Sequence, residues 1–416
     1  MLLIKNIRSL AGILDAGVLK LAGPEMNNFK TIDNAFLLIE NGKIKLFGTM
    51  DEWHKVKETI TIVNNEIDAT GKFVIPAYCD SHTHIVYAAP REEEFVDRIN
   101  GLSYEQIAQR GGGILNSAKK VALASEEELY NSAMARIQLM IDKGTCAIEI
   151  KSGYGLSVEG ELKMLRVIKK LKENAGIIIK STFLGAHALP AIYKENRKGY
   201  IDLLINELMP AIEKEKLADY CDVFCEQGYF SPEETIQILE AGKKHGMIPK
   251  VHANQMSNSG GVQAGVKCNA ISVDHLEYVG DEEISALLKS QTMPTVLPGA
   301  AFFLSLPLPP ARKMIDAGLP VAVASDFNPG SSPTGDMNFM VSLLCIQYKL
   351  NPSEAFNAAT INSAYAMNVS DVTGSITIGK QANFIITKEI SSLSYLPYSF
   401  NEHMIQDVFI DGKKRN

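Results

Sequence analysis

The 416-residue sequence has no long apolar run and no strong excess of either charge. Nowhere do 18 apolar residues follow one another, so the sequence predicts no membrane-spanning helix. The formal net charge of -7 at pH 7 offers no basic surface for nucleic acid or for anionic lipid. The composition therefore predicts a globular protein that acts on a small molecule, with no nucleic-acid partner and no membrane partner.

Signals for export and for disulfides are also missing. The first ten residues, MLLIKNIRSL, lack the basic segment, apolar stretch and small-residue cleavage site of a signal peptide. The six cysteines are scattered through apolar segments, which favours reduced, buried thiols. Cys221 and Cys225 have three residues between them, but there is no second such pair nearby. We therefore interpret them as core residues rather than metal ligands, and we expect a cytoplasmic protein.

Short apolar runs alternate with amphipathic helical segments between residues 76 and 364. The segment SPEETIQILEAGKKHG, for example, predicts a helix with Ser231 as its N-cap and Glu234 at the capping-box position. Eight strand and helix units predict an α/β fold, a (β/α)8 TIM-type barrel. A doubly wound sheet is the alternative, because periodicity does not show whether a sheet closes. The eight predicted strands are residues 74–80, 146–150, 177–183, 221–225, 248–251, 270–273, 292–297 and 321–324.

Both ends of the chain predict β-hairpins. The segment FLLIENGKIKLFG carries Asn41 and Gly42 between two apolar runs, and DVFIDGKKR carries Asp411 and Gly412. Asn-Gly and Asp-Gly are the pairs that two-residue hairpin turns favour. The flanks therefore predict β-structure outside the barrel.

Polar side chains follow the predicted strands at the end where a barrel carries its chemistry. Because side chains alternate along a strand, His82 and His84 point to the same face and can reach one ion. Three imidazoles and a carboxylate suit Zn(II) or Fe(II), and a free coordination position lowers the pKa of a bound water. The sequence therefore predicts one catalytic metal ion. The predicted ligands are His82 and His84 after the first strand, His252 after the fifth and Asp326 after the eighth.

Two of these strand ends also predict acid–base chemistry. Asp326 can take the proton from the attacking water with an oxygen that no metal ion occupies. His275, after the sixth strand, is placed to polarise a carbonyl group or to orient that water. The alternative is that His275 is a core residue bonded to Asp274 or to a main-chain carbonyl group.

The motif IPAYCDSHTH, with the later histidines and aspartate, resembles the amidohydrolase superfamily. The motifs KSGYG and SDFNPGSSPT are similar to those of the imidazolonepropionase family of histidine degradation, and the similarity covers nearly the whole chain. This resemblance implies a barrel domain of residues 76–370 and a small β-sandwich domain built from both termini, residues 1–75 plus 371–416. It also implies one divalent or trivalent metal ion per subunit, Zn or Fe, and hydrolysis of 4-imidazolone-5-propanoate to N-formimidoyl-L-glutamate.

Several residues are candidates for binding this substrate. The guanidinium group of Arg91 matches the carboxylate of the propanoate tail, although a surface ion pair with a nearby glutamate is the alternative. The hydroxyl group of Tyr154 can bond the same ligand or only pack over the barrel mouth. His187 is a candidate for substrate contact because the metal ligands are already supplied. The loop after Asp326 can bond nitrogen atoms of the substrate or product, or form an ordinary turn, through Asn328, Gly330 and Ser331.

Gln255 distinguishes the predicted reaction from a deaminase, which is the main alternative. Many metal-dependent deaminases of this superfamily, and some imidazolonepropionases, have a glutamate three residues after the fifth-strand histidine, where this sequence reads HANQ. An amide cannot transfer a proton at neutral pH. We therefore expect Gln255 to hold the substrate while Asp326 and His275 move the protons. A scaffold protein without metal is the remaining alternative.

Three further predictions concern a lysine near the site, a glycine-rich segment and the oligomeric state. We interpret Lys151, behind the second strand, as a structural lysine rather than a carbamylated metal bridge. The glycines 111 to 113 fit the hinge of a lid, a segment that brings main-chain amides near a ligand, or an ordinary flexible loop. A homodimer is expected on general grounds, because two-fold dimers are the commonest assemblies.

Overall fold

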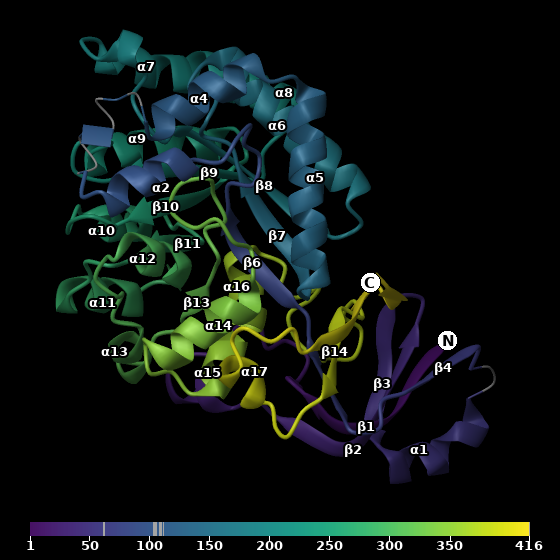
Figure 1. The fold of residues 1–416 in the computed structure, drawn as a ribbon. Helices are drawn as coiled ribbons and strands as arrows, with labels where there is room; N and C mark the ends of the chain where they lie inside the picture. Colours follow the sequence, from purple (N-terminus) through teal and green to yellow (C-terminus); the bar gives the residue numbers. More distant parts are fainter. Residues whose placement is uncertain (61–62, 103–105, 108–109, 111, 416) are drawn as a thin grey trace.

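The computed structural model describes residues 1–60, 63–102, 106–107, 110 and 112–415. Gly111, one of the three consecutive glycines, lies outside the described residues. Eight parallel strands form a sheet in which each strand pairs with the next one along the chain (Figure 1). These strands are β6 (Tyr78–Thr83), β7 (Thr145–Lys151), β8 (Ile178–Ala186), β9 (Tyr220–Cys225), β10 (Ile248–Ala253), β11 (Ser272–His275), β12 (Met293–Val296) and β13 (Ala322–Val323).

The first and last strands of this sheet meet and nearly close it into a barrel. Thr83 forms an isolated parallel bridge with Phe327, which lies just after β13. The main-chain N–H of Asp326 donates to the carbonyl oxygen of His82 at 3.0 Å, and the N–H of His84 donates to that of Phe327 at 2.9 Å. The predicted (β/α)8 barrel is therefore confirmed, and the doubly wound sheet is wrong.

Helices follow the strands and surround the barrel (Figure 1). The helix predicted to begin after Ser231 does so, because the Ser231 side chain accepts from the N–H of Glu234 and the Glu234 side chain accepts from the N–H of Ser231. The helices are α2 (Glu92–Ile99), α4 (Ile114–Leu123), α5 (Glu126–Asp142), α6 (Val158–Asn174), α7 (Arg197–Leu203), α8 (Met209–Glu215), α9 (Pro232–Lys244), α10 (Gly261–Lys267), α11 (Asp281–Leu288), α12 (Pro298–Leu304), α13 (Ala311–Asp316), α14 (Met337–Ile346), α15 (Pro352–Asn357) and α16 (Ser363–Ala366).

A second, mixed sheet combines strands from both chain ends. Its predicted turns are present, since Asn41, Gly42, Asp411 and Gly412 all have the positive φ that two-residue hairpin turns require. Side chains from β1, β2, β3, β5, β14 and β15 share one apolar core, so the sheet folds over itself as a small sandwich. Its strands are β1 (Leu2–Ala11), β2 (Thr31–Glu40), β3 (Lys43–Thr49), β4 (Asn65–Asp68), β5 (Lys72–Pro76), β14 (Phe384–Glu389), β15 (Ile405–Ile410) and β16 (Lys413–Lys414).

The terminal sheet lies at the end of the barrel opposite to the predicted chemistry (Figure 1). β5 passes through Ala77 directly into β6, and Gly144, just before β7, leaves no room for a Cβ atom beside Ile385 of β14. Helix α1 (Met50–Val56) covers the sheet's other face with Trp53, and α17 (Tyr395–Tyr398) packs on α14. The domain limits at 75/76 and 370/371 stay a prediction.

Two expectations from composition can be compared with the structure. None of the six cysteines forms a disulfide; five are buried and Cys345 is partly exposed. Among the described residues, no helix combines the length and the apolar character needed to cross a membrane.

A buried carboxyl group helps to close the barrel, which gives a test of its contribution. The N–H of Ser325 donates to Asp80 Oδ1 at 3.0 Å, and the Ser325 hydroxyl donates to Oδ2. Asp80→Ala leaves both buried donors without an acceptor, so we expect the free energy of unfolding to fall by about 3 kcal/mol. Asp80→Asn keeps one oxygen and should cost roughly half as much. Urea unfolding followed by circular dichroism measures both, and unchanged stability of Asp80→Ala would contradict this role.

Candidate active site

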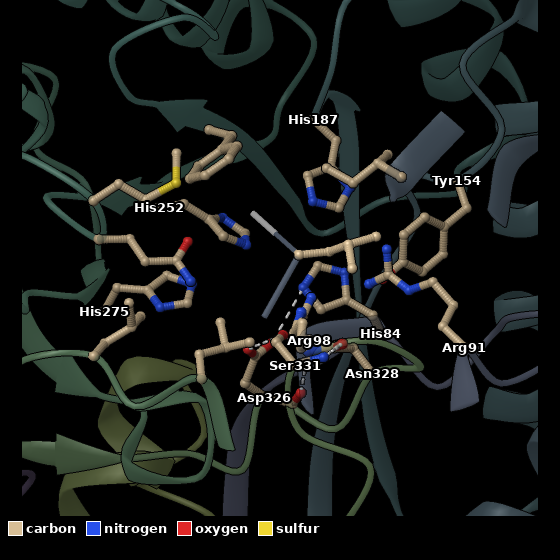
Figure 2. Close-up of a pocket in the computed structure, with 17 residues that line it drawn as sticks. His84, Arg91, Arg98, Tyr154, His187, His252, His275, Asp326, Asn328 and Ser331 are labelled. Carbon is tan, nitrogen blue, oxygen red and sulfur yellow. Dashed lines mark hydrogen bonds and ion pairs between the residues drawn. The ribbon is translucent and has the colours of Figure 1, made fainter. Parts of the chain in front are cut away.

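A cavity of about 400 Å³ opens at the carboxyl ends of the barrel strands. Figure 2 shows side chains from several strand ends converging on it. His82 lies beneath the lining, fully buried, and Gly330 lies behind Arg91. The predicted site residues that line the cavity are His84, Arg91, Tyr154, His187, His252, Gln255, His275, Asp326, Asn328 and Ser331.

Three histidines at the base of the cavity form a group that can hold a metal ion. One ring nitrogen from each of His82, His84 and His252 lies within 4.8 Å of the others. The Nε2 atoms of His82 and His84 are 3.2 Å apart, and Asp326 Oδ1 is 3.6 Å from each. Two nitrogens bound to one tetrahedral zinc ion lie about 3.4 Å apart. The spacing of these donor atoms therefore fits a metal ion.

Carboxylates behind two of the histidines orient their rings. His82 Nδ1 lies 2.7 Å from Asp274 Oδ2, and His252 Nδ1 lies 3.0 Å from Asp222 Oδ2. A proton on Nδ1 of His82 therefore points to Asp274 and leaves the Nε2 lone pair free, whereas Nδ1 of His252 lies within ion-pair distance of Asp222 without a hydrogen bond among the described residues. Nε2 of His252 is buried and has no hydrogen-bond partner among the described residues. An orphaned buried acceptor of this kind fits a site built for a metal ion.

Burial also keeps the imidazoles in the form that binds metal. It lowers the pKa of His82 and His84 well below the usual value, and the other nearby cationic groups lower it further. Burial lowers the pKa of His252 to about 4, although the Asp222 carboxylate opposes this shift. The three rings are therefore neutral at pH 7, as metal ligation requires.

Lys151 belongs to a buried ionic network beneath the histidines. Its Nζ lies 2.6 Å from Glu149 Oε1 and 2.8 Å from Asp222 Oδ2. Lys250 Nζ pairs with the other oxygen of Glu149 at 2.9 Å. Burial lowers the pKa of Lys151, but the carboxylates outweigh this effect and the pKa is raised. A charged amine held in this way agrees with the structural interpretation of Lys151, because carbamylation needs a neutral amine.

The loop after β13 holds Asp326 against the histidines. Asp326 has φ 53°, and Asn328 fixes the turn by donating from Nδ2 to the Asp326 carbonyl oxygen at 2.7 Å. Asn328 Oδ1 accepts from the N–H groups of Gly330 and Ser331, each at 2.8 Å. The Ser331 hydroxyl donates to Asp326 Oδ2 at 3.3 Å. Burial raises the pKa of Asp326 to about 6, although His275 and these hydrogen bonds lower it.

Arg91 lies buried against Gly330 at one side of the cavity. A Cβ atom on Gly330 would stand 1.6 Å from Arg91 Nη2, so only glycine leaves room for this guanidinium group. Glu94 Oε2 is 3.8 Å from Arg91 Nη1, and both side chains are only 8% exposed. The ion pair with a nearby glutamate that the alternative named is therefore present, but it is buried rather than on the surface. Gly113 of the glycine-rich segment donates its N–H to the same Glu94 at 2.9 Å.

Aromatic side chains form the wall beside Arg91. The His187 ring stacks on His84 with 5.3 Å between centroids, and Tyr154 lies 5.5 Å from His187. His187 Nδ1 is 3.0 Å from the carbonyl oxygen of Gly153, so Nδ1 carries the proton and Nε2 is left for the cavity. Burial lowers the pKa of His187 to about 3.

His275 lies on the other side of the histidine group and is not bonded to Asp274. Asp274 Oδ2 contacts His82 Nδ1 instead. The carboxylate beside His275 Nδ1 is that of Glu277, at 3.7 Å. Burial lowers the pKa of His275, but Glu277 and the other nearby carboxylates outweigh it, so that the pKa is raised. The contact with Asp274 that the alternative included is therefore not formed.

Sequence reasoning missed several residues of the cavity. Arg98, two helical turns after Arg91 on α2, donates from Nη1 to the Gly330 carbonyl oxygen at 3.1 Å. The helical spacing from Arg91 is the signal that could have found it. The apolar lining residues carry no such signal, because in sequence they resemble the core; they are Leu102, Ile114, Phe224, Met256, Leu304 and Leu306.

Comparison with known proteins agrees with this fold and this site. The profile of the Amidohydrolase family matches residues 73–415, and the chain therefore belongs to this family. Within it, the chain is 57% identical over 411 residues to the imidazolonepropionase of Flavobacterium johnsoniae and 56% identical over 412 residues to that of Christiangramia forsetii. Each alignment covers 99% of both proteins, which places the chain in the imidazolonepropionase family.

A solved structure shows the same fold at low sequence identity. It is an adenosine deaminase from Xanthomonas campestris with bound zinc, with a TM-score of 0.71 and 16% identity. The alignment covers 99% of this chain and 92% of the deaminase. At this identity the likeness concerns the fold alone.

The histidine group predicts a measurable metal content. We expect His252→Ala to lower the metal bound per purified chain by at least about tenfold, because it removes one of three imidazole donors. His187→Ala is the matched control, since it removes a buried cavity histidine whose Nδ1 bonds a main-chain carbonyl group. Elemental analysis after dialysis measures both variants. Equal metal content in His252→Ala and the unchanged protein would contradict the assignment.

Proposed function

We propose that this protein hydrolyses the cyclic amide bond of 4-imidazolone-5-propanoate and releases N-formimidoyl-L-glutamate. One observation carries the proposal: the cavity holds a buried guanidinium group, Arg91, on one side and the metal-binding histidines on the other. A small ring with a carboxylate tail fits such a cavity, with the tail on Arg91 and the ring over the histidines. The relatives named above support the same reaction.

The proposed reaction depends on one bound metal ion. His82, His84, His252 and Asp326 hold one ion per subunit, Zn or Fe, since imidazole and carboxylate suit both. When bound, such an ion polarises a carbonyl oxygen and lowers the pKa of a water ligand toward neutrality.

Asp326 and His275 carry the proton chemistry. Asp326 takes a proton from the attacking water, whose oxygen adds to the ring carbonyl carbon. His275 donates a hydrogen bond to the carbonyl oxygen as negative charge develops there. The C–N bond then breaks and Asp326 returns the proton to the leaving nitrogen. The carboxylic acid formed at the former carbonyl carbon loses its remaining proton to solvent and becomes a carboxylate. The raised pKa of His275 supports its role as a donor.

The remaining residues bind and orient the substrate. Arg91 and Tyr154 bind the propanoate carboxylate, and His187 contacts the substrate through the nitrogen that faces the cavity. Gln255 holds the ring without transferring a proton. The loop of Asn328, Gly330 and Ser331 bonds nitrogen atoms of the substrate and product.

Location and assembly complete the proposal. The six free cysteines, five of them buried, support a reducing compartment, the cytoplasm. A homodimer is the assembly we propose, because closed two-fold dimers are the commonest form.

Direct assay tests the reaction. Metal-loaded protein is expected to remove the ultraviolet absorbance of 4-imidazolone-5-propanoate and to release N-formimidoyl-L-glutamate without ammonia. Mass spectrometry identifies the product, and a coupled ammonia assay separates hydrolysis from deamination. Ammonia release, or no turnover by protein with a full complement of metal, would overturn the proposal.

Two substitutions test the carboxylate site. Arg91→Lys loses the bidentate contact with the carboxylate and should raise KM about tenfold or more, with a smaller effect on kcat. Gly330→Ala should have a similar effect, because its Cβ atom would occupy the place of the guanidinium group. Steady-state kinetics measure both. An unchanged KM in both variants would mean that the tail binds elsewhere.

A further inference from the structure

Glu277 is a buried carboxyl group that the proposed mechanism does not use. Its side chain is fully buried, and neither oxygen has a hydrogen-bond partner among the described residues. Burying a carboxylate without hydrogen bonds is unfavourable, because the group loses its hydration without gaining protein partners. A buried carboxyl group without partners is therefore a candidate for a functional role. The Nδ1 atom of His275 lies 3.7 Å from Glu277 Oε1.

The backbone is strained where it brings these two side chains together. His275 ends β11 with φ 90°, and Leu276 follows with φ 75°, both in the left-handed region that side chains disfavour. Two hydrogen bonds to the end of β10 hold this turn: Leu276 N–H to the Ala253 carbonyl oxygen at 3.1 Å, and Tyr278 N–H to that of Asn254 at 2.9 Å. Strain held in this way is typical of functional sites.

The neighbouring acid serves a different imidazole. Asp274 Oδ2 lies 2.7 Å from His82 Nδ1, so it is already engaged behind a metal-binding histidine. Glu277 does not line the cavity, whereas His275 does. Glu277 therefore has no direct contact with a bound substrate, and His275 is the cavity-lining side chain within 4 Å of it.

We propose that Glu277 is the positioning residue for His275: its carboxylate accepts the Nδ1 proton and turns Nε2 toward the substrate. The inference rests on the proposed function, in which His275 donates to the ring carbonyl oxygen. The 3.7 Å separation is longer than a hydrogen bond, and such contacts often tighten when a substrate binds. With the carboxylate at Nδ1, the ring can carry a second proton on Nε2 and act as a donor there.

A double-mutant cycle tests this role. In the metal-loaded enzyme, Glu277→Gln is expected to lower kcat by about 10- to 100-fold with KM within about threefold, because an amide no longer fixes the Nδ1 proton. In the His275→Ala background, Glu277→Gln should have no further effect on kcat, since it acts through the missing ring. Equal fold losses in both backgrounds would indicate a general structural role and overturn the proposal.

A matched variant controls for the loss of a buried negative charge. Glu354→Gln removes another buried carboxylate, which pairs with Arg312 at 2.7 Å outside the cavity lining. Its kcat should stay unchanged. Elemental analysis should give the same metal content for all variants as for the unchanged protein.

A measurement without turnover separates this inference from the proposed function. Nitrogen-15 NMR of histidine-labelled protein, with the His275 signals assigned by difference from His275→Ala, reports which ring nitrogen carries a proton. Nδ1 should be protonated in the unchanged protein and lose this preference in Glu277→Gln; an unprotonated Nδ1 would overturn the inference. Failure to hydrolyse 4-imidazolone-5-propanoate would instead overturn the proposed function and leave the NMR result to decide the Glu277 contact.

Discussion

A buried ionic network at the centre of the barrel is the interaction on which the site depends. Lys151 and Lys250 pair there with Glu149 and Asp222, all of them out of contact with solvent. Removing one partner of a buried ion pair costs about 3–5 kcal/mol, because the other charge is left uncompensated. Burial raises the pKa of Asp222, but His252 and Lys151 outweigh this effect and hold the pKa well below its usual value. Asp274 lies 3.8 Å from both lysines and 2.7 Å from His82 Nδ1, and Asp222 lies 3.0 Å from His252 Nδ1. Both carboxylates therefore stand behind histidines of the metal-binding group.

Closure of the barrel between β13 and β6 fixes the position of Asp326 beside the histidine group. β13 has only two residues in regular strand pairing, so the seam beyond it depends on Ser325, Asp326 and Phe327. The same main-chain bonds that join this segment to β6 place the Asp326 carboxylate 3.6 Å from His82 and His84. The segment of residues 325–327 therefore both closes the barrel and sets the position of Asp326 in the site.

From the sequence it was possible to predict at which strand ends the polar residues of the site lie, but not which side chains they contact. The H-x-H spacing predicted that His82 and His84 share a face, and their Nε2 atoms lie 3.2 Å apart. Alternation along β11 would send Asp274 and His275 to opposite faces, yet both approach the interior because the positive φ at His275 turns the chain. A positive φ at a non-glycine residue leaves no mark in a sequence, so Glu277 was beyond prediction. The barrel and the hairpins were predictable because they follow from local periodicity and turn residues.

The two cavity histidines outside the metal-binding group differ in the direction of their pKa shifts and in the groups that face their Nδ1 atoms. His187 and His275 are both buried, yet the pKa of His187 falls to about 3 whereas that of His275 is raised. The Nδ1 of His187 faces a main-chain carbonyl group, which accepts a proton without supplying a negative charge. The Nδ1 of His275 faces the Glu277 carboxylate, which has no hydrogen-bond partner among the described residues and which stabilises a positive ring together with Asp326 and Asp274. A fold shared with deaminases does not fix this difference. It comes from the residues that follow each strand, and these set the chemistry that one barrel can perform.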